Sequence, residues 1–595
     1  MARVQVPFYQ VSIEDRLWKS RMQTMSTVTL FDCLDKCEST GRIANFRRAA
    51  GWEEGPFQGI YYNDSDVYKV LEGVGYSLRT FPDKALEARA DAVIDAIAAA
   101  QREDGYLQTY FQLADVGHEW TDMEKHEMYC AGHLMEAAVA YYHSTGKDKL
   151  LKVACRLADH LCNTFGQGKR HWVPGHEEIE LALIRMYDAT GHEEYLTLAR
   201  FLLEERGHGH GRGRIWTDEH FGKAYAQDEV PVRELRRVAG HAVRAMYLLT
   251  AMADSLREGG GADYLPALKA VHEHVTEHHM YITGGIGSTA SNEGFDLDDS
   301  LPNDTAYCET CASVGMVYWN QRMNLLTGDS RYCDVLERAM YNGVLSGYGL
   351  SGKEFFYDNP LSSDGSKARQ PWFDCSCCPT QLARFIPSVG GYLYAQQEQR
   401  LYINLYCSSR VTAELAEGNV ALRVSTDYPW NGQVSVAVEA AEKPFTLCFR
   451  YPQWCKSMTL RVNGQPVAAE ADGHGYLCLH GLCAGDAVEA LMDMPVRLVH
   501  AHARVQEDHG QAAVMRGPVV FCAEAQDQPM HWDALRIRSD SHFLCQFRPD
   551  LLDGVMTLTN EQGVMLIPYA VWNNRGTERM TVWMPEDAAD ASLYS

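Results

Sequence analysis

The spacing of hydrophobic residues divides the chain near residue 395. From about residue 15 to 395, apolar side chains recur with the period of an α-helix. Between Leu86 and Ile97 they fall at i, i+4, i+7, i+8 and i+11, and Asp83 is placed to cap the N-terminus of that helix. Similar patterns predict helices over about 127–143, 147–165, 177–190, 193–206, 235–256, 262–279, 305–326 and 329–346.

Short turns separate these helices, among them "STGKDK", "ATGHEE" and "LTGDSR". Such turns predict consecutive helical hairpins, which form either an open superhelix or a closed ring. No repeat with a solenoid consensus is visible. We therefore predict an enzyme-like toroid of six helical hairpins.

After residue 395 the pattern changes to short alternating segments such as "VALRVSTDYPW", "QVSVAVEA" and "FTLCFRYP". Turn residues separate them at a spacing of roughly 8 to 12 residues, which is typical of β-sandwiches. We predict a helical domain over 1–395, a β-sandwich domain over 396–503 and a second β-rich domain over 504–595.

Charge and composition narrow the possible partners. The formal charge of −25, from 79 acidic and 54 basic residues, disfavours nucleic acid and anionic membranes. The start "MARVQVPFYQ" has no secretory pattern and no run of 18 apolar residues occurs, so we expect a cytoplasmic protein. Most of the 18 cysteines sit singly in apolar runs, which is typical of buried reduced thiols.

One group of cysteines differs from the rest. The stretch "FDCSCCPTQ" brings together Cys375, Cys377 and Cys378, and "AYCETCAS" supplies Glu309 and Cys311. Zn²⁺ prefers such thiolate and carboxylate ligands, often from two segments, and adjacent cysteines make poor disulfide partners. The pattern favours metal binding or catalysis, but it matches no common zinc-finger spacing and leaves a cluster of unligated thiols open.

A carboxylate and three histidines give weaker signals. Glu293 lies in the Gly- and Ser-rich segment "TGGIGSTASNEG", which could present it to a cavity, although a solvated surface charge is the simpler interpretation. His133, His176 and His241 stand at or near the openings of apolar helices. There they could hydrogen-bond to sugar hydroxyls or serve only as core and capping residues.

Seven motifs occur in order over most of the first 395 residues: "GHLMEA", "PGHEEIELAL", "GHAVRAMYL", "TGGIGS", "LPNDTAYCETCAS", "EFFYDNPL" and "CSCCP". Together they resemble glycoside hydrolase family 127, typified by β-L-arabinofuranosidases. The resemblance implies an (α/α)6 barrel catalytic domain followed by β-sandwich domains. It also implies a Zn²⁺ ion held by one glutamate and three cysteines.

The resemblance assigns roles to individual residues. The metal ligands would be Glu309, Cys311, Cys377 and Cys378, with Cys377 also the nucleophile, Glu293 the general acid/base and Cys375 a neighbour; the sugar contacts would be His133, His176, His241 and Tyr357. The reaction would be exo-acting hydrolysis, with retention, of terminal β-L-arabinofuranosides in plant glycans or oligosaccharides. We expect a sulfur-to-carboxyl distance like the roughly 5 to 5.5 Å of ordinary retaining glycosidases.

The chain departs from the family pattern at Asp32-Cys33, at Glu229 and at Asn292, which leaves the exact sugar open. Two other functions remain at this point: a polysaccharide lyase or isomerase on a six-hairpin barrel, and a non-catalytic carbohydrate-binding protein with structural zinc. The oligomeric state is also open, with a homodimer as one option.

Overall fold

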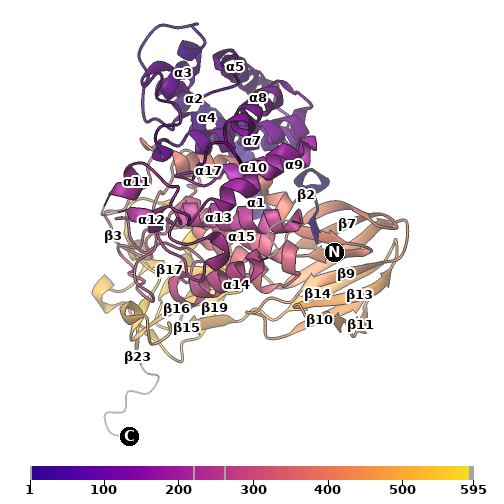
Figure 1. Ribbon diagram of the computed structural model, residues 1–595. Coiled ribbons are helices and arrows are strands. Elements are labelled where there is room, and N and C mark those ends of the chain that lie inside the picture. Colours follow the sequence, from indigo (N-terminus) through magenta and orange to yellow (C-terminus); the bar gives the residue numbers. More distant parts are fainter. Residues whose placement is uncertain (1–2, 219–220, 260–262, 588–595) are drawn as a thin grey trace.

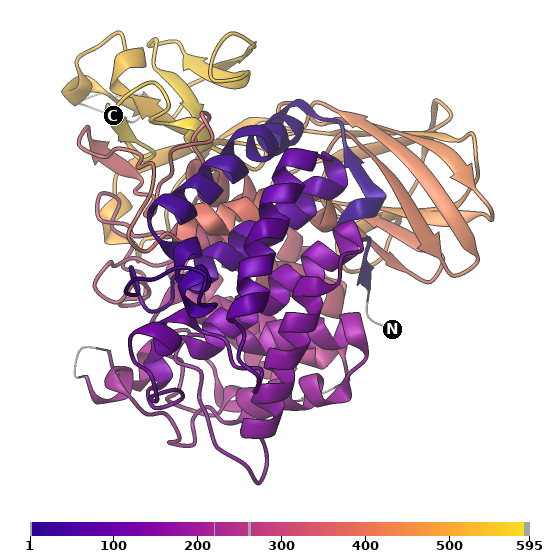
Figure 2. The ribbon, with the colours of Figure 1, turned by 90° about the horizontal axis from the view of Figure 1, so that it is seen from above.

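The computed structural model describes residues 3–218, 221–259 and 263–587. Helices occupy the N-terminal part of the chain, indigo to magenta in Figure 1, and sheets occupy the C-terminal part in orange and yellow. Figure 2 shows the two sheet regions on different sides of the helices.

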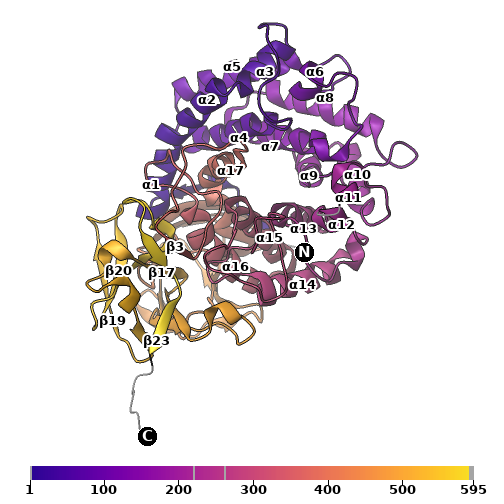
Figure 3. The same ribbon diagram turned by 90° about the vertical axis from the view of Figure 1, so that its left-hand side faces the viewer.

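Within these residues, six helices pack on one another in a closed order, α4 on α7, then α9, α13, α15 and α17, and α17 again on α4. Figure 3 looks onto this ring. The ring helices are α4 (Asp64–Thr80), α7 (Glu127–Thr145), α9 (Ile179–Thr190), α13 (Ala242–Arg257), α15 (Thr310–Thr327) and α17 (Cys377–Phe385).

Most ring helices pack against the helix that follows them in the chain, as expected of hairpins. These partners are α5 (Lys84–Ala100), α8 (Lys149–Thr164), α10 (Glu193–Glu204), α14 (Tyr264–His274) and α16 (Arg331–Arg338). The other helices are α1 (Arg16–Thr24), α2 (Leu30–Ser39), α3 (Arg42–Ala49), α6 (Thr109–Leu113), α11 (Arg214–Thr217) and α12 (Gly222–Tyr225).

Helix α5 confirms the expected capping. The Asp83 carboxylate accepts the backbone N–H groups of Ala85 at 2.8 Å and Leu86 at 3.0 Å, and the predicted apolar face is buried. Other helix starts were predicted too early: α13 begins at Ala242 and α15 at Thr310, because the residues before them are loops that turn toward the ring's centre. Residue 262, the predicted start of α14, lies outside the described residues.

Two sheets follow the ring, and in the described residues they have six and seven strands. Apolar residues from both sheets belong to one core, as in a β-sandwich. Their strands are β4 (Tyr394–Gln397), β5 (Arg400–Ile403), β6 (Ser409–Leu415), β7 (Gly418–Thr426), β8 (Gln433–Ala441), β9 (Phe445–Arg450), β10 (Met458–Val462), β11 (Gln465–Val467), β12 (Glu470–Ala471), β13 (Tyr476–Leu482) and β14 (Ala487–Met492).

A third sheet contains the last part of the chain. Its strands are β15 (Val496–Val499), β16 (Gln511–Arg516), β17 (Val519–Glu524), β18 (Ile537–Arg538), β19 (Phe543–Arg548), β20 (Val555–Asn560), β21 (Met565–Pro568), β22 (Arg579–Thr581) and β23 (Met584–Asp587). No helix in the described ranges is long and apolar enough to cross a membrane.

Three short strands tie the helical region to the sheets. Near the N-terminus, β1 (Val4–Gln5) pairs with β4 and β2 (Val11–Ile13) pairs with β6. Strand β3 (Ser362–Asp364), from the loop before α17, pairs with β22. The sequence pattern did not reveal these pairings, because strands of two or three residues are too short to show a period.

The cysteines are mostly free thiols, as expected. Among the described residues, Cys448 and Cys478 form a disulfide between neighbouring strands β9 and β13, so the expectation of reduced thiols is wrong for this pair. The two face each other across the ladder, which brings their sulfurs together. Sequence spacing could not show this, because the register depends on the intervening β-strands.

Candidate active site

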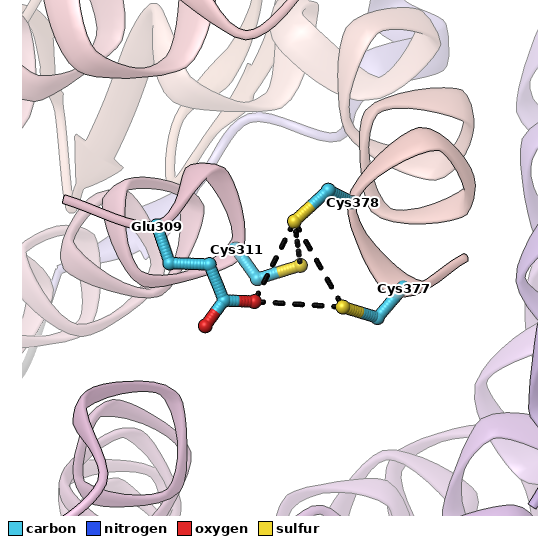
Figure 4. A group of neighbouring side chains, drawn as sticks. All are labelled: Glu309, Cys311, Cys377 and Cys378. Atoms are coloured by element: carbon cyan, nitrogen blue, oxygen red, sulfur yellow. Dashed lines mark hydrogen bonds between the residues drawn. The ribbon is translucent and has the colours of Figure 1, made fainter. Parts of the chain in front are cut away.

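The four cysteine and glutamate residues predicted as ligands lie together at the N-termini of α15 and α17 (Figure 4). Glu309 is the N-cap of α15 and Cys311 lies in its first turn, while Cys377 and Cys378 begin α17. The two helices pack side by side in the ring. Helix N-termini carry partial positive charge and favour anionic groups such as thiolates and carboxylates.

The distances within this cluster fit a tetrahedral metal site. Oε1 of Glu309 lies 3.4 Å from Sγ of Cys377 and 3.5 Å from Sγ of Cys378. Sγ of Cys378 lies 3.4 Å from that of Cys311 and 3.8 Å from that of Cys377. Two thiolates bound to one Zn²⁺ at about 2.3 Å in tetrahedral geometry would be about 3.8 Å apart. The donor set and its spacing are therefore compatible with a tetrahedral metal ion such as Zn²⁺.

The electrostatics of the cluster point the same way. Burial, followed by repulsion from Cys377, raises the pKa of Glu309 well above its usual value, and burial also raises that of Cys378. Oε2 of Glu309 is buried without a hydrogen-bond partner among the described residues. Acidic groups gathered in this way lack a compensating positive charge, which a divalent cation would supply.

Backbone contacts fix the cluster. The N–H of Thr310 donates to the carbonyl of Tyr357 at 2.9 Å, and the Asn359 amide donates to the carbonyl of Cys308 at 2.9 Å. Cys308 itself has a φ of +36°, which turns the chain just before α15. The loop before α17 thus braces the start of α15 and brings Tyr357 to the cluster.

Cys377 is the cluster's half-buried cysteine, and it lines a cavity of about 230 Å³. Its Sγ lies 3.0 Å from the hydroxyl of Tyr357, which can donate a hydrogen bond to a thiolate. Cys375 also lines the cavity, with its Sγ 3.7 Å from the same hydroxyl, but it lies outside the four-ligand group. Glu309 and Cys311 also line this cavity, whereas Cys378 does not, and Cys377 is the most exposed of the three cysteines in the group.

Glu293 lines the same cavity from the glycine-rich loop. It adopts a φ of +52°, which is strained for a glutamate. The next residue is a glycine because a Cβ on Gly294 would lie 1.9 Å from the carbonyl oxygen of Gly240. This close approach docks the loop on the start of α13, where the N–H of Ala242 donates to the Glu293 carbonyl at 3.1 Å.

His241 orients the Glu293 carboxylate. As the N-cap of α13, its Nδ1 accepts the N–H of Val243 at 3.2 Å, so the proton of the neutral ring lies on Nε2. That nitrogen is 3.4 Å from Oε2 of Glu293, and the hydroxyl of Tyr307 donates to the same oxygen at 3.3 Å. Burial lowers the pKa of His241, which favours the neutral ring.

The pKa of Glu293 reflects opposing effects. Burial raises it, but the hydrogen bonds from His241 and Tyr307 and the positive charge of Arg244 outweigh burial and lower the pKa below its usual value. Glu293 is thus a carboxylate in the free protein. It faces a cavity that Cys377 also lines, so a carboxylate and a thiol share one cavity.

The predicted sugar-contact residues divide into two groups. Tyr357, His176 and His241 line the cavity. His133 does not belong to that lining in the described structure: it is fully buried behind Tyr129, with its Nδ1 3.0 Å from Oε1 of Glu178. A residue in this position supports Tyr129, and its contact with a sugar stays a prediction.

The sequence analysis did not select several polar and aromatic lining residues. Arg244 is buried, donates to the Gly175 carbonyl at 2.6 Å and lies 4.3 Å over the ring of Tyr225. The other unselected lining residues include Tyr61, Tyr62, Asp66 and Tyr129. Arg244 lies three positions after His241 on α13, so helical periodicity was one signal that could have found it.

Three models of one protein family together match most of the chain. Residues 10–391 match the model for the "Beta-L-arabinofuranosidase, GH127 catalytic domain". Residues 400–494 match the GH127 middle domain, and residues 496–585 match the "Glycoside hydrolase family 127 C-terminal domain".

Individual relatives agree with this match. The "Non-reducing end beta-L-arabinofuranosidase" of Bifidobacterium longum subsp. longum is 38% identical over 558 residues, 87% of this chain and 84% of its own length. The solved structure of a GH127 beta-arabinofuranosidase has a TM-score of 0.93, 38% identity and 98% coverage of both chains. A GH127 beta-L-arabinofuranosidase from Geobacillus stearothermophilus T6 has a TM-score of 0.91 and 38% identity, covering 97% of this chain and 100% of its own.

Proposed function

This chain belongs to glycoside hydrolase family 127, and from that premise we propose that it is a retaining, zinc-dependent exo-β-L-arabinofuranosidase. Family membership confirms the resemblance found in the sequence and makes the protein a glycoside hydrolase. It removes the grounds for a lyase, an isomerase or a non-catalytic sugar-binding protein. The substrate, the metal and the nucleophile are the proposed part.

The observation that carries the proposal is the position of Cys377, which belongs to the metal-like cluster and also lines the cavity of Glu293. Glu309, Cys311, Cys377 and Cys378 would hold the ion. A bound Zn²⁺ would keep these thiols as thiolates at neutral pH, where a free thiol with a pKa of about 8.5 is mostly protonated.

In the first step, Sγ of Cys377 attacks the anomeric carbon and forms a C–S bond as the glycosidic C–O bond breaks. Glu293 gives its proton to the departing oxygen. In the second step, Glu293 takes a proton from water, the water oxygen bonds to the same carbon, and the C–S bond breaks. Two inversions give retention. The expected sulfur-to-carboxyl distance of about 5 to 5.5 Å stays a prediction.

The low pKa of Glu293 places a requirement on the first step. A carboxylate suits the second step, but the first step needs a protonated acid. A sugar that fills the cavity displaces water from this carboxyl, and the added desolvation raises its pKa. His176 and His241, which burial keeps neutral, would bind sugar hydroxyls together with Tyr357.

The closed order of six helices supports an (α/α)6 barrel as the catalytic fold. In such a ring the N-terminal ends of the helices form one mouth. The lining residues Asp66, Tyr129, Arg244, Cys311 and Cys377 all lie near the N-termini of ring helices. A pocket in this position admits one terminal sugar, which supports an exo mode of action.

The test is hydrolysis of a panel of aryl furanosides and pyranosides, with metal content measured on the same sample. We expect turnover of p-nitrophenyl β-L-arabinofuranoside and about one zinc per chain. Cys311→Ser should lower both zinc content and turnover. Turnover of another glycoside alone would contradict the substrate, and full activity of metal-free protein would contradict the role of zinc.

A further inference from the structure

A second polar cavity lies where the helical region meets the third sheet. This groove has a volume of about 400 Å³ and shares none of its lining residues with the catalytic cavity. Asp304 and strand β3 form one side of it, and residues 532–536 and 579–585 of the C-terminal sheet region line the rest. The two sides are joined by the β3–β22 ladder, in which Asp364 pairs with Arg579.

Aromatic and apolar side chains form part of the groove. Trp532 begins a short 3-10 helix (Trp532–Ala534) and is half-buried, so part of its indole surface reaches solvent. Leu535, Met580 and Trp583 are buried lining residues that form the floor. Ligand sites characteristically combine such aromatic surface with a few polar groups.

The polar groups around Trp532 are charged but nearly balanced. Arg579 lies 5.4 Å from the centre of the Trp532 ring, and its Nη1 is 3.5 Å from Oδ1 of Asp533. The lining holds the carboxylates of Asp304, Asp364 and Asp533 and the guanidiniums of Arg536 and Arg579. This balance favours neither an anion nor a cation. Planar charged groups of both signs can instead hydrogen-bond to the neighbouring hydroxyls of a neutral sugar.

The groove and the catalytic cavity are built from the same two chain segments. The segment from Asp304 leads directly to Glu309, and β3 follows Tyr357 by five residues. The N–H of Leu361 donates to the carbonyl of Asn303 at 2.8 Å, which holds the segments together at the groove. A catalytic cavity of about 230 Å³ leaves the remaining sugars of a glycan outside it.

We propose that this groove binds the non-reacting sugars of a neutral glycan chain, with Trp532 as the stacking surface and Arg579 and Asp533 as hydrogen-bonding groups. The proposal rests on the proposed function in that the substrate is attached to a glycan. It assigns to the C-terminal sheet a role in holding polymeric substrate near the catalytic cavity.

The test uses native gel electrophoresis of the full chain through gels that contain arabinan, arabinogalactan or, as a control polymer, dextran. The parent protein is Cys377→Ser, so that the polymer is not consumed. Trp532→Ala and Arg579→Ala are compared with Tyr9→Ala, an exposed aromatic residue that lines a different cavity. Thermal unfolding of each variant shows whether it is folded. If Trp532→Ala is unfolded, Arg579→Ala takes its place as the test variant.

We expect arabinan or arabinogalactan to retard the parent and Tyr9→Ala equally, and the apparent Kd to rise at least about tenfold in Trp532→Ala. In protein that keeps Cys377, the Trp532→Ala substitution should not change the turnover of a small aryl β-L-arabinofuranoside. If a polymer retards folded Trp532→Ala and the parent equally, the proposal that the groove binds glycan is wrong. It is also wrong if neither arabinan nor arabinogalactan retards the parent. If the aryl β-L-arabinofuranoside is not hydrolysed but a polymer still retards the parent more than Trp532→Ala, the proposed substrate is wrong and the groove proposal stands.

Discussion

The two mouths of the helical ring differ in whether their charged side chains are paired with opposite charges. The mouth at the helix N-termini holds Cys311, Cys377, Glu293 and Glu309 around a cavity of about 230 Å³. The mouth at the helix C-termini has a larger cavity of about 400 Å³, lined by arginines and acidic residues. By volume alone, the second cavity would be the candidate active site. The thiol and carboxylate groups of the candidate site line the first cavity instead.

Helix dipoles explain where each charge lies. Arg185, Arg257, Arg322 and Arg384 line the C-terminal mouth, where partial negative charge favours cations. Each is within ion-pair distance of a carboxylate, for example Arg384 with Glu72 at 3.0 Å and Arg185 with Glu136 at 2.5 Å. At the N-terminal mouth, the group of Glu309, Cys311, Cys377 and Cys378 has no ion pair with a basic side chain among the described residues. Paired charges stabilise the fold, whereas the uncompensated group at the N-terminal mouth could hold a metal ion.

The strongest test of this difference is Cys377→Ser. A serine hydroxyl in place of the thiolate removes the proposed nucleophile, and we expect kcat to fall roughly 10⁴-fold or more. The measurement is turnover of p-nitrophenyl β-L-arabinofuranoside, with Cys375→Ser as the matched control from the same loop. If Cys377→Ser retains wild-type turnover while Cys375→Ser loses it, the nucleophile is misassigned.

Glu293→Ala tests the other reactive group of the N-terminal mouth. Removal of a general acid/base costs typically 10²- to 10⁴-fold, and the first step suffers most with a leaving group that needs protonation. We therefore expect a larger loss with an alkyl or sugar leaving group than with p-nitrophenol. Equal losses for the two kinds of leaving group would contradict proton donation by Glu293.

Arg185→Met tests the mouth at the helix C-termini. It leaves Glu136 with only the more distant Arg384, at 3.7 Å, in place of Arg185 at 2.5 Å. Because Arg185 is partly exposed, we expect a loss of about 1–3 kcal/mol of unfolding free energy. We expect lower stability in urea and unchanged kcat/KM. A variant of wild-type stability that has lost its turnover would show that this mouth also takes part in catalysis.

Tyr307→Phe is expected to have the smallest effect. The Tyr307 hydroxyl favours the ionised form of Glu293, so its loss raises the Glu293 pKa. In the sugar complex the protonated acid then persists to higher pH, and the alkaline limb of kcat shifts upward by up to about one pH unit. Tyr225→Phe, also in the cavity wall, is the control. A shift to lower pH would mean that Tyr307 acts on another group.

Local sequence patterns predicted most helices and the residues that gather at the candidate site, but not their surroundings. The capping of α5 by Asp83 depends on adjacent residues, so it could be predicted directly. The pairing of β3 with β22 joins residues more than 200 positions apart, and the Trp532 groove depends on that pairing. His133 stays a prediction: its motif fits the family pattern, and the structure places its buried ring against Tyr129, outside the described cavity lining.

The sequence by itself determined the donor types of this protein, because three cysteines and a glutamate in two short motifs already restrict the chemistry to soft metals and thiolates. It also determined where helices give way to strands, because hydrophobic period is a local property. Only the tertiary structure decided which acidic groups stay uncompensated. That outcome depends on which helix ends meet in the ring and on which arginines reach a carboxylate, and both are set by contacts between residues far apart in the chain.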